Sequence, residues 1–340
     1  MRTLLKSAAG LVCAGALTLT GCSSPWPPGP VGARTANPTR TPGIGASARP
    51  TGPPYTPYVS ATTAADTDTA GSPAAYNLAF VVADRASCTP QWGGSAAVDD
   101  PAVSARIREL TAPGRAVRVS FGGADGTELA LACESPSALA DAYARALDNA
   151  DATEADFAVK GANLSDPVSV TRRLEAIAQL QERRDLKVSF SLPALPTGLE
   201  PDGVALLESA DDHGVDIAAV NVLAMNYGTS YTGDMGDYAI TAATAAQAQI
   251  GSVFGLSDPD AWQRLAVTVM LGVNDVQGET FTLTDATRFR AFAKQKNLAW
   301  LSSWSTFRDH QCTNGAATRS STTCSGVLQE RGAFARALSG

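Results

Sequence analysis

The sequence Asp151-Ala-Thr-Glu-Ala-Asp-Phe-Ala-Val-Lys-Gly-Ala-Asn163 predicts a short buried strand that is followed by a glycine, Gly161. Side chains alternate between the two faces of a strand, so Asp156, Ala158 and Lys160 are expected on one face. This inward face then carries a charged side chain at each end. We therefore expect this strand end to hold a functional site or the remains of one.

Strand-like and helix-like segments alternate from residue 57 onward. Most strand-like segments are short apolar runs, as in a parallel sheet that is covered on both faces. The predicted strands are Pro57–Thr62, Tyr76–Val82, Ala116–Phe121, Ala155–Lys160, Lys187–Leu192, Ile217–Met225, Leu265–Leu271 and Ala299–Ser303. The predicted helices are Asp100–Leu110, Ser135–Asn149, Pro167–Arg184, Asp202–His213, Tyr238–Phe254, Thr284–Lys296 and Gly326–Leu338.

This alternation predicts an α/β fold, a single (β/α)8 TIM barrel of about 280 residues. An open doubly wound sheet is the alternative, although its usual GxGxxG motif after the first strand is absent. Reactive groups of such a barrel lie at the carboxyl ends of the strands. Besides the stretch that ends at Gly161, three predicted strand ends are rich in polar, aromatic or glycine residues: Ser120-Phe-Gly-Gly123, Met225-Asn-Tyr-Gly228 and Ser302-Ser-Trp-Ser305.

Together, these strand ends resemble the barrels of glycoside hydrolase family 18, especially the bacterial chitinase-like branch. The matching segments follow the family's order and cover residues 57–338. They are Ser120-Phe-Gly-Gly123, Asp156-Phe157 with Gly161, Met225-Asn-Tyr227 and Trp304. Softer matches are Cys88-Thr-Pro-Gln-Trp-Gly-Gly94, Gly272-Val-Asn-Asp275 and Arg308-Asp309.

The family's signature on the fourth strand is Asp-Gly-x-Asp-x-Asp-x-Glu. Its Glu protonates the leaving oxygen, and the Asp two residues earlier holds the substrate's N-acetyl group, which attacks the sugar carbon. The resemblance places Lys160 at the Glu position and Ala158 at that Asp position. Thr153 and Glu154 replace the first Asp and the Gly, so that Asp156 alone is retained.

Lys160 and Ala158 are poorly suited to this chemistry. A free lysine has a pKa of about 10.4, so it keeps its proton, and an alanine cannot orient an acetamido group. Each lost function typically contributes about 10²–10⁴ in rate, so ordinary hydrolysis is expected to be absent. Lys160 is alternatively a solvated or ion-paired residue of the barrel mouth. Asp156 is a candidate counter-charge, but four residues along a strand span about 13 Å, so a direct pair needs an acid from another strand.

The resemblance also implies a sugar-binding groove. Trp304 would form its floor and stack on a sugar ring, Tyr227 would offer a hydroxyl, and Asn226, where the family often has Asp, would form amide hydrogen bonds. The remaining candidate contacts are Met225, Ala158, Gly122 and Gly123. As alternatives, Trp304 and Tyr227 are core aromatics, and the two glycines serve close packing at the barrel rim.

The N-terminus predicts export. A basic start, Met1–Lys6, precedes a short apolar run at residues 7–19, and Leu19-Thr-Gly-Cys22 resembles the bacterial lipobox. We expect a signal peptide at residues 1–21, a lipid on Cys22, a Pro/Gly/Ser-rich disordered tether at residues 22–54 and the barrel at residues 55–340. The expected location is the outer face of the cell membrane, either anchored or released. An ordinary secretory signal is the alternative.

Composition narrows the partners and cofactors. The net charge of −7, or −9 without Arg2 and Lys6 of the signal, argues against nucleic acid. With His213 and His310 as the two histidines and no CxxC motif, we expect no metal and no cofactor. We expect a monomer whose partners are a carbohydrate and, through Cys22, a membrane.

Export and an even number of remaining cysteines favour disulfides. We prefer the pairs Cys88–Cys133, between two loops that follow successive strands, and Cys312–Cys324, across a Gly/Ser/Thr-rich loop. Free thiols and the two other pairings are the alternatives.

Three functions are compatible with these observations. The first is a catalytically impaired, surface-anchored lipoprotein that binds chitin-like or other N-acetylated glycans. The second is an active enzyme, either a glycosidase with Glu154 as a displaced acid or a Lys160-dependent enzyme of another class, such as one forming a Schiff base. The third is a structural or partner-binding lipoprotein without a glycan ligand.

Overall fold

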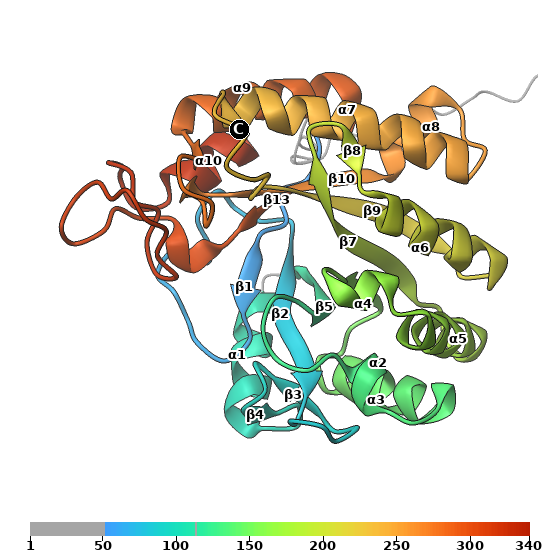
Figure 1. Ribbon diagram of the computed structural model, residues 1–340. Coiled ribbons are helices and arrows are strands. Elements are labelled where there is room, and N and C mark those ends of the chain that lie inside the picture. Colours follow the sequence, from blue (N-terminus) through green and yellow to red (C-terminus); the bar gives the residue numbers. More distant parts are fainter. Residues whose placement is uncertain (1–51, 113) are drawn as a thin grey trace, which may run out of the picture. The chain divides into compact units, whose positions relative to one another are not determined.

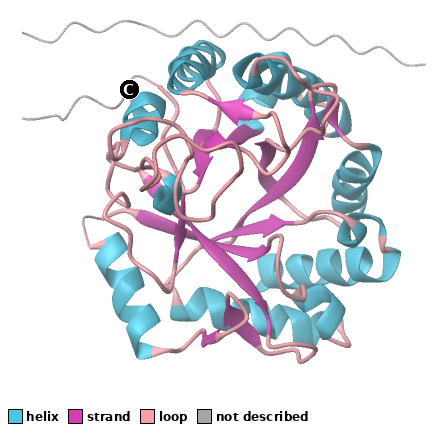
Figure 2. Cartoon of the chain, turned by 60° about the vertical axis from the view of Figure 1, so that its left-hand side comes forward, coloured by secondary structure: helices cyan, strands magenta, loops and turns pink. Residues whose placement is uncertain are grey.

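The computed structural model describes residues 52–112 and 114–340, in which parallel strands form a closed barrel with helices outside it (Figures 1 and 2). The barrel strands pair in chain order. They are β1 (Tyr58–Ser60), β2 (Ala75–Ala83), β5 (Ala116–Gly122), β6 (Glu154–Ala158), β7 (Lys187–Leu195), β9 (Ile217–Ala224), β10 (Leu265–Met270) and β13 (Trp300–Trp304). The segment before β1 closes the ring, because Thr56 N–H donates to Leu301 O (2.7 Å) and Leu301 N–H donates to Pro54 O (2.9 Å).

The long helices lie between successive strands and cover the barrel (Figure 2). They are α1 (Pro101–Thr111), α3 (Pro136–Asn149), α5 (Pro167–Arg183), α6 (Pro201–Asp212), α7 (Met235–Val253) and α9 (Leu283–Lys296). Shorter helical segments are α2 (Leu129–Ala132), α4 (Ala162–Ser165), α8 (Asp258–Arg264), η1 (Thr306–Arg308) and α10 (Ala333–Ser339).

Local sequence fixes several helix starts. Asp100, Ser135 and Asp166 each accept a hydrogen bond from a backbone N–H of the first turn. A proline follows each of them, where the missing N–H costs nothing and the fixed φ suits a helix. These caps set the helix starts and thereby the lengths of the loops that reach the barrel mouth.

The predicted barrel is confirmed, and each predicted strand matches an observed strand with ends shifted by a few residues. The prediction was wrong at two places. β6 ends at Ala158, so Lys160 lies in the following loop instead of the strand. The last helix begins at Ala333 instead of Gly326, because the buried Asp309 carboxylate accepts hydrogen bonds from the N–H groups of Phe334 and Ala335. The sequence did not predict the short strands that lie in the loops between the barrel strands and the helices. They are β3 (Pro90–Trp92), β4 (Ala96–Ala97), β8 (Gly198–Leu199), β11 (Gly272–Val273) and β12 (Thr280–Phe281).

Polar side chains fill the inside of the barrel, whereas apolar side chains pack between strands and helices. Asn221 links β9 to its neighbours, because it donates to Ser191 Oγ (2.7 Å) and accepts from Thr268 Oγ1 (2.9 Å). Such a network is favourable only when its members are satisfied. The positions of the strand ends at the barrel mouth therefore depend on hydrogen bonds inside the barrel.

At the amino-terminal ends of the strands, Arg118 closes the barrel. Its guanidinium lies 4.0 Å from the ring centroid of Trp300 and pairs with Glu154 at 2.7 Å. Lys187 approaches the same Glu154 carboxylate at 3.8 Å. This end of the barrel is therefore occupied by a charge cluster that stabilises the fold.

Both preferred disulfides, Cys88–Cys133 and Cys312–Cys324, are present. The expected signal peptide, the Cys22 lipid and nearly all of the tether fall on residues that the structure does not describe. Among the helices of residues 52–340 that are described, none is long and apolar enough to cross a membrane.

The two disulfides are predicted to contribute unequally to stability. Cys88 and Cys133 are 45 residues apart and Cys312 and Cys324 are 12 apart, so loop-closure entropy gives about 4 and about 3 kcal/mol. Replacing the first pair by alanine should lower the free energy of unfolding more than replacing the second, as measured by urea denaturation. An equal loss, or the reverse order, contradicts this assignment.

Candidate functional site

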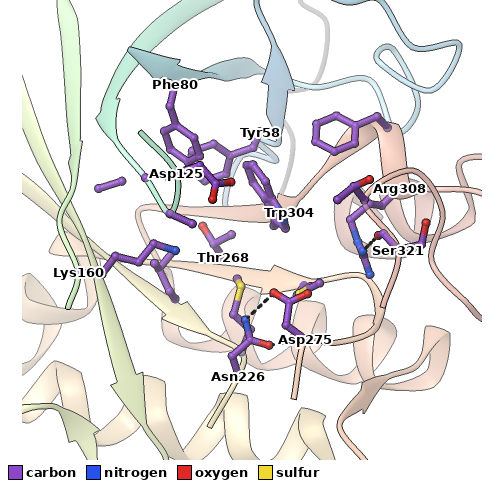
Figure 3. A pocket seen from close by; sticks show the side chains of 18 residues that line it. Tyr58, Phe80, Asp125, Lys160, Asn226, Thr268, Asp275, Trp304, Arg308 and Ser321 are labelled. Carbon is purple, nitrogen blue, oxygen red and sulfur yellow. Dashed lines mark hydrogen bonds between the residues drawn. The ribbon is translucent and has the colours of Figure 1, made fainter. Parts of the chain in front are cut away.

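A cavity of about 430 Å³ opens at the carboxyl ends of the barrel strands (Figure 3). Its volume lies within the range of about 300–1,000 Å³ that small-molecule sites usually have. Its walls come from strands β1, β2, β6, β9, β10 and β13 and from the segments that follow β5, β6, β9, β10 and β13. The cavity is therefore where the strand-end motifs predicted a site.

An aromatic cluster forms one wall of the cavity. The Trp304 ring stacks on Phe80 with centroids 5.4 Å apart and planes at 23°, and it meets the edges of Tyr58 and Phe307 at 5.7 Å each. Trp304 is only partly buried and lines the cavity. The cluster fixes the indole ring while leaving part of it open to a ligand, as stacking on a sugar ring requires.

Asp156 lies beneath the cavity and does not line it. Tyr58 and Ser120 donate hydrogen bonds to its Oδ2 at 3.0 and 2.6 Å, and Ser189 and Ser191 donate to its Oδ1 at 2.9 and 2.8 Å. Its side chain is 1% exposed. Asp156 therefore organises the strands below the site, and the structure gives it no direct access to a ligand in the cavity.

Ala158 and Lys160 both line the cavity (Figure 3). Burial lowers the pKa of Lys160 from its ordinary 10.5, while the negative charges of Asp125 and Asp275 act in the opposite direction. No ion pair joins its ammonium to a carboxylate of the described residues. The candidate counter-charge Asp156 does not pair with Lys160, because its oxygens accept hydrogen bonds from four hydroxyls. The carboxylates that act on Lys160 are those of Asp125 and Asp275, which lie in two other loops.

Asn226 holds Asp275 at the rim of the cavity (Figure 3). Its Nδ2 donates to the Asp275 carboxylate at 3.1 Å, and its Oδ1 accepts from the Asp275 N–H at 2.9 Å. The buried Glu279 accepts from Gly228 N–H at 2.9 Å and fixes the same loop. Asn226 therefore has half of its amide hydrogen-bonding capacity left for a ligand, and the adjacent Met225 lines the cavity beside it.

The predicted role of Tyr227 does not fit the structure. Its side chain is 5% exposed, packs against the rings of Tyr231 and Tyr238, and is not among the residues that line the cavity. Asn226 has a left-handed backbone (φ 58°), which turns the chain so that the next side chain packs behind the loop. Burial, together with the nearby Glu279, raises the pKa of the Tyr227 hydroxyl.

Gly122, the last residue of β5, and Gly123, which follows it, differ in their position at the cavity. Gly123 lines the cavity, whereas Gly122 does not. Both have positive φ. A Cβ atom added to Gly122 would lie 2.6 Å from Ala158 O, and one added to Gly123 would lie 2.7 Å from the Phe80 ring. Close packing of the rim is the reason for glycine at both positions.

Glu154 does not supply a displaced acid to the cavity. It stands at the amino-terminal end of β6, where Arg118 and Lys187 pair with it. The carboxylates that line the cavity among the described residues are those of Asp125 and Asp275, and both are exposed.

Arg308 forms the wall opposite Lys160 in Figure 3. Its guanidinium is buried and donates to Leu271 O (2.9 Å), Val273 O (2.7 Å) and Ser321 O. Burial lowers its pKa to about 10, and its Nε has no partner within the described residues. The bond to Ser321 holds the Cys312–Cys324 loop against the cavity, which Ser321 and Thr322 line.

Several cavity residues were not predicted as site residues. Asp275 and Arg308 occur in segments that contributed to the family resemblance, but their roles were not assigned. Tyr58, Phe80, Asp125 and Phe307 reach the cavity from strands or loops whose sequences carry no distinctive motif. Within the described part of the chain, no group of three or more His, Cys, Asp or Glu residues could hold a metal ion.

The fold and the cavity together define a barrel protein with a sugar-sized aromatic site at its mouth. The chain is 33% identical to a probable bifunctional chitinase/lysozyme of Escherichia coli over 275 residues, which are 75% of this chain and 31% of that protein. It is 32% identical to Endochitinase 11 of Metarhizium anisopliae over 248 residues, 69% of this chain and 47% of that protein. The chain thus spans less than half the length of either relative.

Solved structures give the same result. The catalytic domain of a hyperthermophilic chitinase from Pyrococcus furiosus superposes with a TM-score of 0.74 and 27% identity, covering 85% of this chain and 96% of that one. A family 18 chitinase from Pseudoalteromonas aurantia shares the fold, with a TM-score of 0.54, 16% identity and coverage of 74% and 93%. No protein-family profile matches the chain. From these relatives, the chain belongs to the chitinase-like proteins of glycoside hydrolase family 18.

Lys160 is predicted to destabilise the folded protein at neutral pH. Because burial lowers its pKa, the cost of its charge is complete below the folded-state pKa and disappears as pH rises above the unfolded-state value. Lys160→Met should therefore be more stable than the wild type at pH 7, and this advantage should shrink toward pH 10 in urea unfolding.

Lys187→Met is the matched control, because the Lys187 side chain is 68% exposed at the other end of the barrel. It should show no comparable dependence on pH. A Lys160→Met variant whose stability difference from the wild type is constant over this pH range contradicts the account of Lys160.

Proposed function

We propose that this protein is an exported, surface-anchored chitinase-like protein that binds N-acetylated glycans in the barrel mouth and does not hydrolyse them at an ordinary family rate. The observation that carries the proposal is a cavity lined by the partly exposed Trp304 ring, Lys160 and Ala158. The sequence resemblance assigns the last two residues to the positions of the family's acid and its partner. Anchoring rests on the sequence around Cys22.

Glycan binding is supported by the relatives and by the cavity itself. The relatives are named chitinases, and the Pyrococcus furiosus domain has been solved with chito-oligosaccharides as catalytic-site mutants. In this chain the aromatic wall of Trp304, Phe80 and Tyr58 is intact, and Asn226 and Thr268 add polar groups around it. An apolar wall with a few polar groups is the usual composition of a small-molecule site.

Impaired hydrolysis follows from the groups at the cavity. The ammonium of Lys160 is a poor proton donor, and Ala158 offers no carboxylate to orient an acetamido group. Asp275 is tied to Asn226, and Asp125 stands exposed on the rim. Neither of these carboxylates stands at the sequence position that the resemblance assigns to the acid or to its partner.

Binding without cleavage is the direct expectation. Calorimetry of the full-length protein with chitotetraose should show saturable binding, and chromatography of the same samples should show no shorter sugars. Trp304→Ala should weaken binding at least about tenfold, as loss of a central aromatic contact usually does, whereas Trp304→Phe should retain most of it. Cleavage at about 1 per second, a typical enzymatic rate, contradicts the proposal.

Restoring the two carboxylates should restore some hydrolysis. The double variant Ala158→Asp/Lys160→Glu should cleave chitotetraose at least about a hundredfold faster than the wild type, since each such group contributes about 10²–10⁴. Lys160→Glu alone should gain less. A double variant that folds and binds chitotetraose without any gain in cleavage would show that these positions are not the acid and its partner.

A further inference from the structure

We propose that the natural ligand of the cavity is an N-acetylated glycan that carries a carboxylate, and that Lys160 pairs with this carboxylate. The inference rests on the proposed glycan-binding function and specifies the class of glycan. It follows from the charges around the cavity.

The ammonium of Lys160 has no carboxylate partner among the described residues. It lines the cavity, is partly buried, and forms no ion pair within the described residues. Burying a charge without a partner is unfavourable. A ligand that fills the cavity removes further water from this ammonium, so a neutral ligand increases the cost and an anionic group offsets it.

The acids near Lys160 do not remove this need. Asp156, below the cavity, already accepts hydrogen bonds from four hydroxyls. Asp275 is held by Asn226 through its carboxylate and its N–H. Asp125 and Asp275 are both exposed on the rim, where water screens their charges.

The opposite wall is also positive. The guanidinium of Arg308 is 1% exposed, faces carbonyl oxygens instead of a carboxylate, and has an unpartnered Nε. Figure 3 shows Lys160 and Arg308 on opposite sides of the cavity, with Trp304 between them. The cavity interior therefore presents cations around an aromatic surface, whereas its acids are at the rim.

These features fit a sugar ring with one negative charge. Trp304 offers a face for the ring, and Lys160 offers a single ammonium for a substituent of that ring or of its neighbour. A carboxylate supplies a single negative charge, which the single ammonium of Lys160 can balance.

The test compares three tetrasaccharides in calorimetry with the full-length protein. Chitotetraose is neutral. The second probe alternates N-acetylglucosamine with N-acetylmuramic acid, which carries a lactyl carboxylate, and the third alternates N-acetylglucosamine with glucuronic acid. We expect at least one acidic probe to bind about tenfold or more tightly than chitotetraose, as a charge-assisted contact allows. The difference between the acidic probes identifies the source of the carboxylate.

Variants assign the preference to Lys160. Lys160→Gln should abolish the preference for the acidic probe, and Lys160→Arg, which keeps the positive charge, should retain much of it. Lys187→Gln, at the other end of the barrel, should leave the preference unchanged. Thermal unfolding of each variant establishes that it is folded before its affinities are compared.

Three results overturn the inference. If chitotetraose binds as tightly as both acidic probes, or if the acidic preference survives in Lys160→Gln, the carboxylate pairing is wrong and glycan binding still stands. If none of the three probes binds, the proposed glycan-binding function fails and the inference fails with it.

Discussion

The barrel mouth depends on a buried carboxylate that no ligand reaches. Asp156 on β6 accepts hydrogen bonds from hydroxyls of β1, β5 and β7, so that a single side chain joins four strands of the ring. Leaving such donors unsatisfied inside a barrel is costly. The network positions Tyr58, against which Trp304 packs, and it fixes the end of β6, from which Ala158 and Lys160 enter the cavity.

This arrangement separates the support of the site from its chemistry. The support consists of Asp156, its hydroxyl partners and the close-packed Gly122 and Gly123, which hold the strand ends around the cavity. The resemblance assigns Ala158 and Lys160 to the positions of the groups that the family uses for bond cleavage, and both side chains line the cavity. The cavity thus combines an aromatic wall of Trp304, Phe80 and Tyr58 with the ammonium of Lys160.

The sequence predicted the barrel and the strand ends that meet at its mouth, because periodic apolar runs and capped helices are local signals. It did not predict where individual side chains point. Asn226 has a left-handed backbone and bonds to Asp275 of a distant loop, and the Tyr227 side chain that follows it packs away from the cavity. Lys160 faces Asp125 and Asp275 because loops from distant parts of the chain converge there. Arg308 bonds to Ser321 of the loop that the Cys312–Cys324 disulfide closes, and no local sequence pattern predicts this contact.

Lys160 carries a partly buried ammonium that forms no ion pair with a carboxylate of the described residues. The most direct measurement is the pKa of this lysine by NMR in the ligand-free protein, with Lys160→Gln to assign its signal. We predict a value below the ordinary 10.5, since burial outweighs the two rim carboxylates. A value at or above 10.5 would mean that Asp125 or Asp275 pairs with Lys160 in solution, which would contradict the account.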